Sequence, residues 1–103
     1  MKHIVKWGII GLGNIAHHFA KSFYNLDNAK LVAVASNSKE KLLRFSENYH
    51  IKSENLYNSY EEILEDNNLD IIYIALPNSL HFEYSKKALQ NNKSVICEKP
   101  IVT

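Results

Sequence analysis

The stretch KWGIIGLGNIA, residues 6–16, decides the fold that this chain can adopt. Its first half is mostly apolar, and its second half carries the pattern Gly-x-Gly-x-x-Ala over residues 11–16. This pattern is informative where it follows a strand and opens a helix, because the glycines then form the tight turn of a βαβ unit. All three glycines of the chain lie within this stretch. We therefore expect a strand, a tight turn and a helix, in this order.

Short apolar runs rich in Ile and Val recur along the chain and alternate with stretches of helical spacing. The runs are residues 4–10, 31–35, 71–76 and 95–97, with a weaker short strand at 56–57. Such runs are typical of parallel strands that are buried on both faces. Right-handed crossovers then place helices on both faces of one sheet. The sequence predicts an α/β fold: a doubly wound parallel sheet of the Rossmann type, truncated after about five strands.

Polar residues indicate where the helices begin and end. Ser59 with Glu62 forms a capping box for the third helix, and the pair Asn78 and Ser79 offers a cap for the fourth. Asparagine tolerates the left-handed conformation that commonly ends a helix. We expect this role for asparagines near the helix ends, namely Asn25, Asn28, Asn67, Asn68, Asn91 and Asn92.

Composition limits the class of protein. A chain with 46% hydrophobic and 22% charged residues is globular, and its 103 residues form one domain, 1–103. No apolar run approaches the roughly 18 residues of a membrane span, and residues 1–7 lack the layout of a secretory signal. The net charge of +1 without a basic face does not indicate nucleic-acid binding. We expect a cytoplasmic protein with neither a nucleic acid nor a membrane as partner.

Cysteine and histidine do not indicate a metal site. The single cysteine, Cys97, excludes an internal disulfide and lies in an apolar run, where we expect a buried structural thiol. His17 and His18 are expected on the exposed face of the first helix. Adjacent histidines lack the spacing of three or four that helical metal ligands require.

The glycine pattern also indicates a ligand. Gly11 allows the tight turn, Gly13 lets the backbone approach a pyrophosphate, and Ala16 permits close packing of helix on strand. The start of the helix then supplies free N–H groups and a partial positive charge. The residues expected at a dinucleotide are Gly11, Leu12, Gly13, Asn14 and Ile15. The alternative is that these glycines only form a strand-to-helix turn.

The end of the second strand bears on which dinucleotide binds. A carboxylate there would bind the ribose 2'-hydroxyl of NAD, but this chain has Ser36 followed by Asn37. Without a carboxylate nothing repels a 2'-phosphate, and Ser36, Asn37, Lys39 and Lys41 can donate to one. NADP is therefore favoured, with NAD as the alternative. Another interpretation, compatible with phosphate binding, is that Ser38 caps the second helix and the lysines are solvated.

Two further segments follow strands, at the edge where such sheets bind ligands: LPNSLH at residues 76–81 and EKP at 98–100. Each has a simpler explanation when taken alone. The first can be a helix cap followed by a partly buried His81, and the second a surface ion pair of Glu98 and Lys99.

Three motifs together resemble the amino-terminal domain of the Gfo/Idh/MocA oxidoreductases. They are KWGIIGLG at 6–13, Pro-Asn-x-x-His at 77–81 and CEKP at 97–100. The resemblance covers essentially the whole chain. The opening block and YEE at 60–62 are similar to the branch that contains dimeric dihydrodiol dehydrogenases and NADP-dependent xylose dehydrogenases.

The resemblance implies roles for the matched residues. Ser36 and Asn37 would contact the adenosine ribose, and Lys99 would lie beside the nicotinamide and the substrate. An ammonium group there donates to the reacting oxygen during hydride transfer. Glu98 would orient Lys99 or the nicotinamide ribose, and the peptide before Pro100 is a candidate cis bond. The cofactor groove would be lined by Leu76, Pro77, Asn78 and His81.

The chain also departs from this family. The branch often has an arginine where this chain has Asn37, and family members continue into a second α/β domain that supplies the substrate pocket and the usual dimer interface. We expect the cofactor-binding half of an oxidoreductase that transfers hydride between a nicotinamide cofactor and a secondary alcohol or carbonyl of a sugar, polyol or dihydrodiol. The fragment would bind cofactor without turnover, and the full-length protein would form a homo-oligomer through the missing domain. The alternatives are a non-enzymatic nucleotide-binding or sensing module and a cofactor-dependent glycosidase of the same family.

Overall fold

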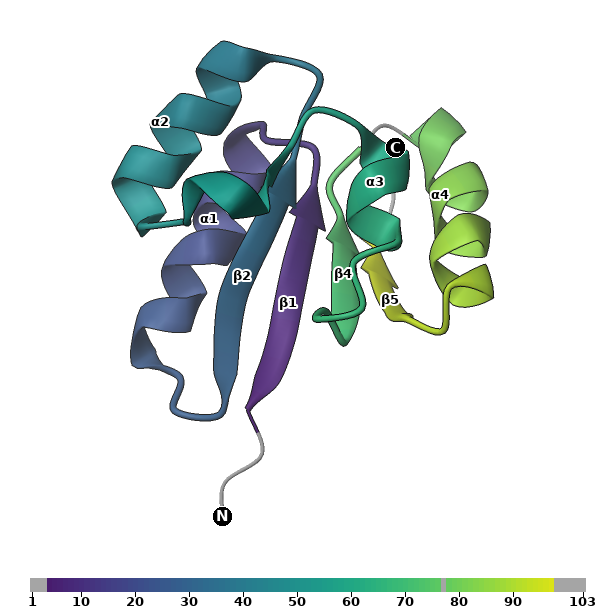
Figure 1. Cartoon of the computed structure of the whole chain (residues 1–103), viewed down its shortest axis with the longest axis horizontal. Helices are drawn as coiled ribbons and strands as arrows, with labels where there is room; N and C mark the ends of the chain where they lie inside the picture. The colour runs from purple at the N-terminus through teal and green to yellow at the C-terminus, as the bar shows by residue number, and fades with distance from the viewer. Residues whose placement is uncertain (1–3, 77, 98–103) are drawn as a thin grey trace, which may run out of the picture.

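A computed structural model describes residues 4–76 and 78–97, with residues 14, 15, 24, 25, 78, 79, 81 and 97 described by their backbone alone. Strands and helices alternate along the chain (Figure 1). In order they are β1 (Val5–Ile10), α1 (Asn14–Lys21), the 3-10 turn η1 (Ser22–Asn25), β2 (Ala29–Ala35), α2 (Lys39–Tyr49), the 3-10 turn η2 (Ser53–Asn55), β3 (Leu56–Tyr57), α3 (Tyr60–Leu64), β4 (Ile71–Ile74), α4 (Asn78–Gln90) and β5 (Ser94–Cys97).

The described strands form one parallel sheet in the order β3-β2-β1-β4-β5. Helices α1 and α2 cover one face of the sheet, and α3 and α4 cover the other (Figure 1). The predicted doubly wound α/β fold is therefore confirmed. Among the described residues, no helix is both long and apolar enough to cross a membrane.

The core is divided by the sheet, because successive residues of a strand point to opposite faces. Ile9, Val34 and Tyr73 pack with side chains from α1 and α2 on one face. Their chain neighbours pack with α3 and α4 on the other face; these are Ile10, Ala33, Ala35, Ile72 and Ile74. Continuous apolar strands thus serve two cores at once, which explains why the strands lack the alternating pattern of a half-exposed sheet.

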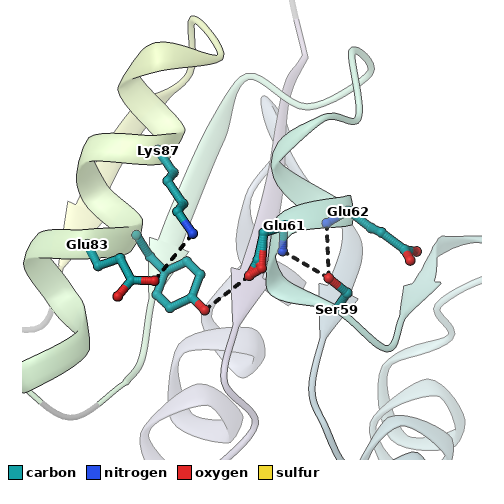
Figure 2. Close-up of polar contacts among 6 residues, drawn as sticks. Ser59, Glu61, Glu62, Glu83 and Lys87 are labelled. Atoms are coloured by element: carbon teal, nitrogen blue, oxygen red, sulfur yellow. Dashed lines mark hydrogen bonds and ion pairs between the residues drawn. The ribbon is translucent and has the colours of Figure 1, made fainter.

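The sequence predicted side-chain caps for α2, α3 and α4, and the structure shows those of α2 and α3. Ser59 Oγ accepts from the backbone N of Glu61 at 3.2 Å and of Glu62 at 3.4 Å (Figure 2), and Ser38 caps α2 by accepting from Lys41 N. α4 begins at Asn78, and the side chains of Asn78 and Ser79 lie outside the described residues, so their role as a cap for α4 stays a prediction. Polar side chains suit the first turn as well as the cap, since its N–H groups lack helical partners.

The left-handed helix ends are fewer than the asparagines suggest. Of the described non-glycine residues, His50 (φ 57°) and Asn92 (φ 62°) have positive φ. Asn92 is as predicted after α4, whereas His50 ends α2 and was not foreseen. The expectation is wrong for Asn25, Asn28, Asn67, Asn68 and Asn91. After α3 the chain turns differently: Asp66 Oδ1 accepts from the backbone N of Asn68 at 2.8 Å.

Helices α3 and α4 are linked by a tyrosine. The Tyr84 hydroxyl of α4 donates to Glu61 Oε1 of α3 at 3.1 Å, while Lys87 Nζ lies 3.3 Å from Glu83 Oε2 and 5.1 Å from the Tyr84 ring centroid (Figure 2). A second tyrosine anchors the edge strand: the Tyr57 hydroxyl donates to Asp66 Oδ2 at 2.7 Å. The first bond joins α4 to α3, and the second joins β3 to the turn that follows α3.

The Tyr57 anchor predicts a loss of stability at alkaline pH. Burial, then the hydrogen bond and charge of Asp66 and the charge of Glu62, raise the pKa of Tyr57 from 10.0 to about 12. Because the folded pKa exceeds the unfolded one, this contribution to stability is complete below pH 10 and is lost as the pH rises toward 12. In urea titrations at about pH 8 and about pH 11, the free energy of unfolding should fall less in Tyr57→Phe than in the unsubstituted chain. Tyr84 titrates in both proteins, so equal losses would contradict the prediction.

Candidate functional site

Turns that follow β1, β2 and β4 meet at one edge of the sheet. Ile10 pairs with Ala35 of β2 and with Ile74 of β4. Gly11 N donates to Ala35 O at 3.0 Å, and Ala75 N donates to Ile10 O at 2.8 Å. From β1 the chain moves outward first through β2 and β3, and then to the other side through β4 and β5. Open α/β sheets bind ligands at this kind of switch point.

Gly11 is required by the close approach of the turns after β1 and β4. Its φ is +89°, and a Cβ at this position would lie 2.6 Å from Ala75 O and 2.9 Å from Leu76 Cδ2. A backbone oxygen held in the next turn cannot move aside as the end of a side chain can. The sequence expectation of a tight turn at Gly11 is confirmed.

Gly13 has a different reason to be glycine. It is the N-cap of α1, in extended conformation and without a side-chain cap, and a Cβ there would meet no atom within 4 Å. The first turn of α1 contains no acidic residue, whereas those of α2 and α3 contain Glu40, Glu61 and Glu62. An uncapped helix start with free N–H groups favours an anion. The space beside Gly13 is therefore open to a phosphate.

Leu12, Asn14 and Ile15 bring backbone N–H groups to the turn at residues 11–15. Leu12 is 5% exposed and its side chain packs among core residues of α1 and α2. Asn14 and Ile15 begin α1, and their side chains lie outside the described part of the chain. The turn at residues 11–15 thus offers peptide groups to a ligand, as a pyrophosphate site requires.

The turn after β2 contains no carboxylate, and a serine shapes it. Ser36 is 5% exposed, its backbone N donates to Tyr57 O at 3.0 Å, and its Oγ accepts from Ser38 N at 3.1 Å. Asn37 is exposed, and Ser38 Oγ accepts from Lys41 N at 3.3 Å. Ser38 therefore caps α2 as the sequence suggested, and Asn37 is the side chain of this turn with the greatest access to solvent.

A hollow of about 380 Å³ lies between the start of α1 and one face of α2. It is lined by Leu12, Gly13, His17, Lys41 and Arg44. Lys41 and Arg44 are three residues apart, so they share a face of α2. The structure thus brings Lys41 close to the turn at residues 11–15. It also adds Arg44, which sequence reasoning missed although its spacing of three residues from Lys41 was visible.

The expectation that His17 is exposed is wrong. Its ring is half-buried, with centroids 4.8 Å from Phe45 and 5.6 Å from Tyr49, and its Nδ1 lies 2.9 Å from Tyr49 Oη. Burial first, and then the charges of Lys21 and His18, lower the pKa of His17. His18 is exposed as expected. A usable signal was that His17 follows Gly13 by four residues, which places both on the same face of α1.

The comparison with known proteins fits this geometry. Residues 5–103 match the family described as "Oxidoreductase family, NAD-binding Rossmann fold". The chain belongs to the Gfo/Idh/MocA oxidoreductase family. The resemblance seen in its motifs is confirmed, and so is the class of its ligand, a nicotinamide dinucleotide.

Relatives in the Gfo/Idh/MocA family are dehydrogenases and other oxidoreductases. The chain is 35% identical over 98 residues to trans-1,2-dihydrobenzene-1,2-diol dehydrogenase of Xenopus tropicalis, covering 93% of this chain and 29% of the relative. It is 37% identical over 110 residues to D-xylose 1-dehydrogenase (NADP(+)) of Hypocrea jecorina, covering 94% and 27%. It superposes with a TM-score of 0.84 and 31% identity on the crystal structure of aldose-aldose oxidoreductase from Caulobacter crescentus, covering 94% and 30%. The chain therefore spans less than a third of the length of these relatives.

The remaining predicted site residues of this Gfo/Idh/MocA domain are described only in part. Leu76 is half-buried and packs on the core beneath α3 and α4. Asn78 and His81 lie in the first part of α4, directly after the turn that follows β4, and their side chains lie outside the described residues. Pro77, Glu98 and Lys99 also lie outside them, as do the peptide before Pro100 and the thiol of Cys97. Their roles stay predictions.

Substitution by alanine should destabilise the protein much more at Gly11 than at Gly13. Gly11→Ala should lower the free energy of unfolding by about 2 kcal/mol or more, because the new Cβ meets a backbone oxygen at an unfavourable φ. Gly13→Ala should cost no more than about 1 kcal/mol, the difference between glycine and alanine at an N-cap. Urea denaturation followed by circular dichroism measures both values. Similar losses in the two variants would show that the turn is not as close to Ala75 as described.

Proposed function

We propose that this chain binds NADP, with the pyrophosphate at the turn of residues 11–15, as the cofactor-binding part of an oxidoreductase. The observation that carries the proposal is the open, uncapped start of α1 at Gly13, beside the switch point of the sheet. A bound dinucleotide there places its phosphates on free N–H groups and on the positive end of the α1 dipole.

The preference for NADP follows from the turn after β2. A carboxylate in this turn would accept from the 2'-hydroxyl of NAD and would repel a 2'-phosphate. Here the buried Ser36 and the exposed Asn37 are uncharged, and Lys41 lies on the adjacent face of α2. The name of one relative, D-xylose 1-dehydrogenase (NADP(+)), agrees with this preference.

Titration of the chain with NADPH and NADH, followed by the fluorescence of the reduced nicotinamide, tests the preference. We expect tighter binding of NADPH, and a loss of binding of both dinucleotides in Gly13→Ala, whose Cβ would occupy the space of the pyrophosphate. Ser36→Asp should reverse the order of affinities. Because Ser36 is buried, Asn37→Asp at the exposed position provides a second carboxylate with less risk to folding. Tighter binding of NADH by the unsubstituted chain would contradict the proposal.

The whole protein is proposed to act on a secondary alcohol or carbonyl of a sugar, polyol or dihydrodiol. The names of the relatives refer to a dihydrodiol, to D-xylose and to aldoses. The cofactor supplies or accepts the hydride. In the direction of reduction, the Lys99 ammonium would donate a proton to the carbonyl oxygen as negative charge develops on it, and Glu98 would hold the ammonium in place.

This role of Lys99 predicts a kinetic effect without a binding effect. In the whole protein, Lys99→Ala should lower kcat by at least about 100-fold, the usual loss of a general acid, and leave the Kd for NADPH within a few-fold. Lys86→Ala, which removes an exposed lysine of α4, is the matched control. Turnover that survives Lys99→Ala would exclude this lysine from the proton transfer.

A further inference from the structure

The hollow between α1 and α2 has the charge of a phosphate site. Lys41 and Arg44 line it from α2, and Leu12 and Gly13 line it from the turn before α1. No carboxylate belongs to the described residues that line it. Glu40 contacts one of the lining residues: its Oε1 lies 2.8 Å from Arg44 Nη2 in an exposed pair. Such an exposed pair is weak, so a dianion can compete with Glu40 for the guanidinium.

The hydrogen bonds of His17 define its neutral form. The Tyr49 hydroxyl donates its one proton to His17 O at 3.2 Å. We therefore assign Nδ1–H as the donor in the contact of 2.9 Å between His17 Nδ1 and Tyr49 Oη. Neutral His17 therefore carries its proton on Nδ1 and a lone pair on Nε2. A lone pair cannot donate to a phosphate, but Nε2 becomes a donor once it takes a second proton.

Without a bound anion, the surroundings of His17 disfavour the charged imidazole. Burial and the charges of Lys21 and His18 on α1 lower the pKa of His17. From α2, the cationic Lys41 and Arg44 line the same hollow, and the Tyr49 hydroxyl is already bonded to the ring. An incoming dianion reverses this balance, because an opposite charge nearby favours the charged imidazole.

We propose that this hollow binds the 2'-phosphate of NADP through Arg44 and Lys41, and that binding places a proton from solvent on Nε2 of His17. The inference rests on the proposed NADP binding. The hollow is bounded by the turn proposed for the pyrophosphate and by the helix that follows the turn proposed for the ribose. The 2'-phosphate is the part of the dinucleotide attached to that ribose.

Variants of α2 test the phosphate contact. Arg44→Gln should weaken NADPH binding about tenfold, a typical effect of losing one charge-assisted hydrogen bond, and should leave NADH binding unchanged. Glu40→Gln should tighten NADPH binding a few-fold, because it frees the guanidinium. Lys86→Gln removes the same charge from exposed α4 and should change neither affinity.

Small probes separate the 2'-phosphate from other phosphates. Adenosine 2',5'-bisphosphate should bind more tightly than adenosine 5'-monophosphate, and Arg44→Gln should abolish that difference. Inorganic phosphate alone should compete with the bisphosphate and not with the monophosphate. If Arg44→Gln weakens both nucleotides equally, Arg44 acts on the 5'-phosphate and the assignment is overturned.

Proton uptake tests His17. Calorimetric titration with NADPH near pH 7, in two buffers of different ionisation enthalpy, gives the number of protons bound. The 2'-phosphate releases protons on entering a cationic site, since its own second pKa is about 6. The contribution of His17 is therefore the number of protons bound by the unsubstituted chain minus the number bound by His17→Asn. The asparagine of this variant keeps a donor for the Tyr49 hydroxyl. We expect greater uptake in the unsubstituted chain with NADPH, and no difference between the two proteins with NADH.

The outcomes distinguish this inference from the proposed function. If NADPH binds more tightly than NADH but neither Arg44→Gln nor His17→Asn alters its binding or proton uptake, the hollow is not the 2'-phosphate site and only this inference is overturned. If neither dinucleotide binds, or if NADH binds more tightly, the proposed function fails first. Loss of affinity for both dinucleotides in Arg44→Gln would indicate a general electrostatic effect and would also overturn the inference.

Discussion

The contact between the Gly11 turn and the Ala75 carbonyl is the constraint on which the site depends. A Cβ at Gly11 would lie 2.6 Å from that oxygen, and the backbone there has φ +89°. This closeness lets β1 and β4 end at the same level, with Ala75 N bonded to Ile10 O. The chain can then turn directly into α1, whose uncapped start at Gly13 faces open space. A wider turn would move the start of α1 away from the switch point.

The two cores explain how a small sheet holds this edge in place. Neighbouring residues of β1, Ile9 and Ile10, are both fully buried, one against α1 and α2 and the other against α3 and α4. Gly8 serves the same packing, because a Cβ there would lie 2.8 Å from Leu69 Cδ1. Both faces therefore restrain β1, so that the turn following it has a defined position relative to α2. The proposed phosphate hollow uses that position.

Much of this arrangement was readable from residue order because it depends on local pattern. Apolar runs predicted the strands, and Ser38 and Ser59 cap helices where their side chains can reach the next free N–H groups. The sequence predictions were wrong where contacts with residues distant in the chain determine the burial or the backbone conformation of a residue. His17 was expected to be exposed, yet α2 brings Phe45 and Tyr49 against its ring. His50, rather than an asparagine, takes the left-handed position after α2, since the rest of the fold determines where that helix must stop.

The sequence by itself determined the strand-turn-helix unit at residues 6–16 and the lack of a carboxylate after the second strand, because each of these depends on residues close together in the chain. It also indicated the family, because three short motifs stand along the chain in a given order and spacing. Only the tertiary structure decided that Gly13, His17 and Arg44 line one hollow. These residues come from two helices, and their proximity follows from the packing of both helices on the same face of the sheet. The small side chains of Ala16 and Ala20, buried in that core, let α1 lie close to the strands and beside α2. The position of α1 beside α2 depends on which face of each helix contacts the other, and the sequence of one helix does not specify this contact.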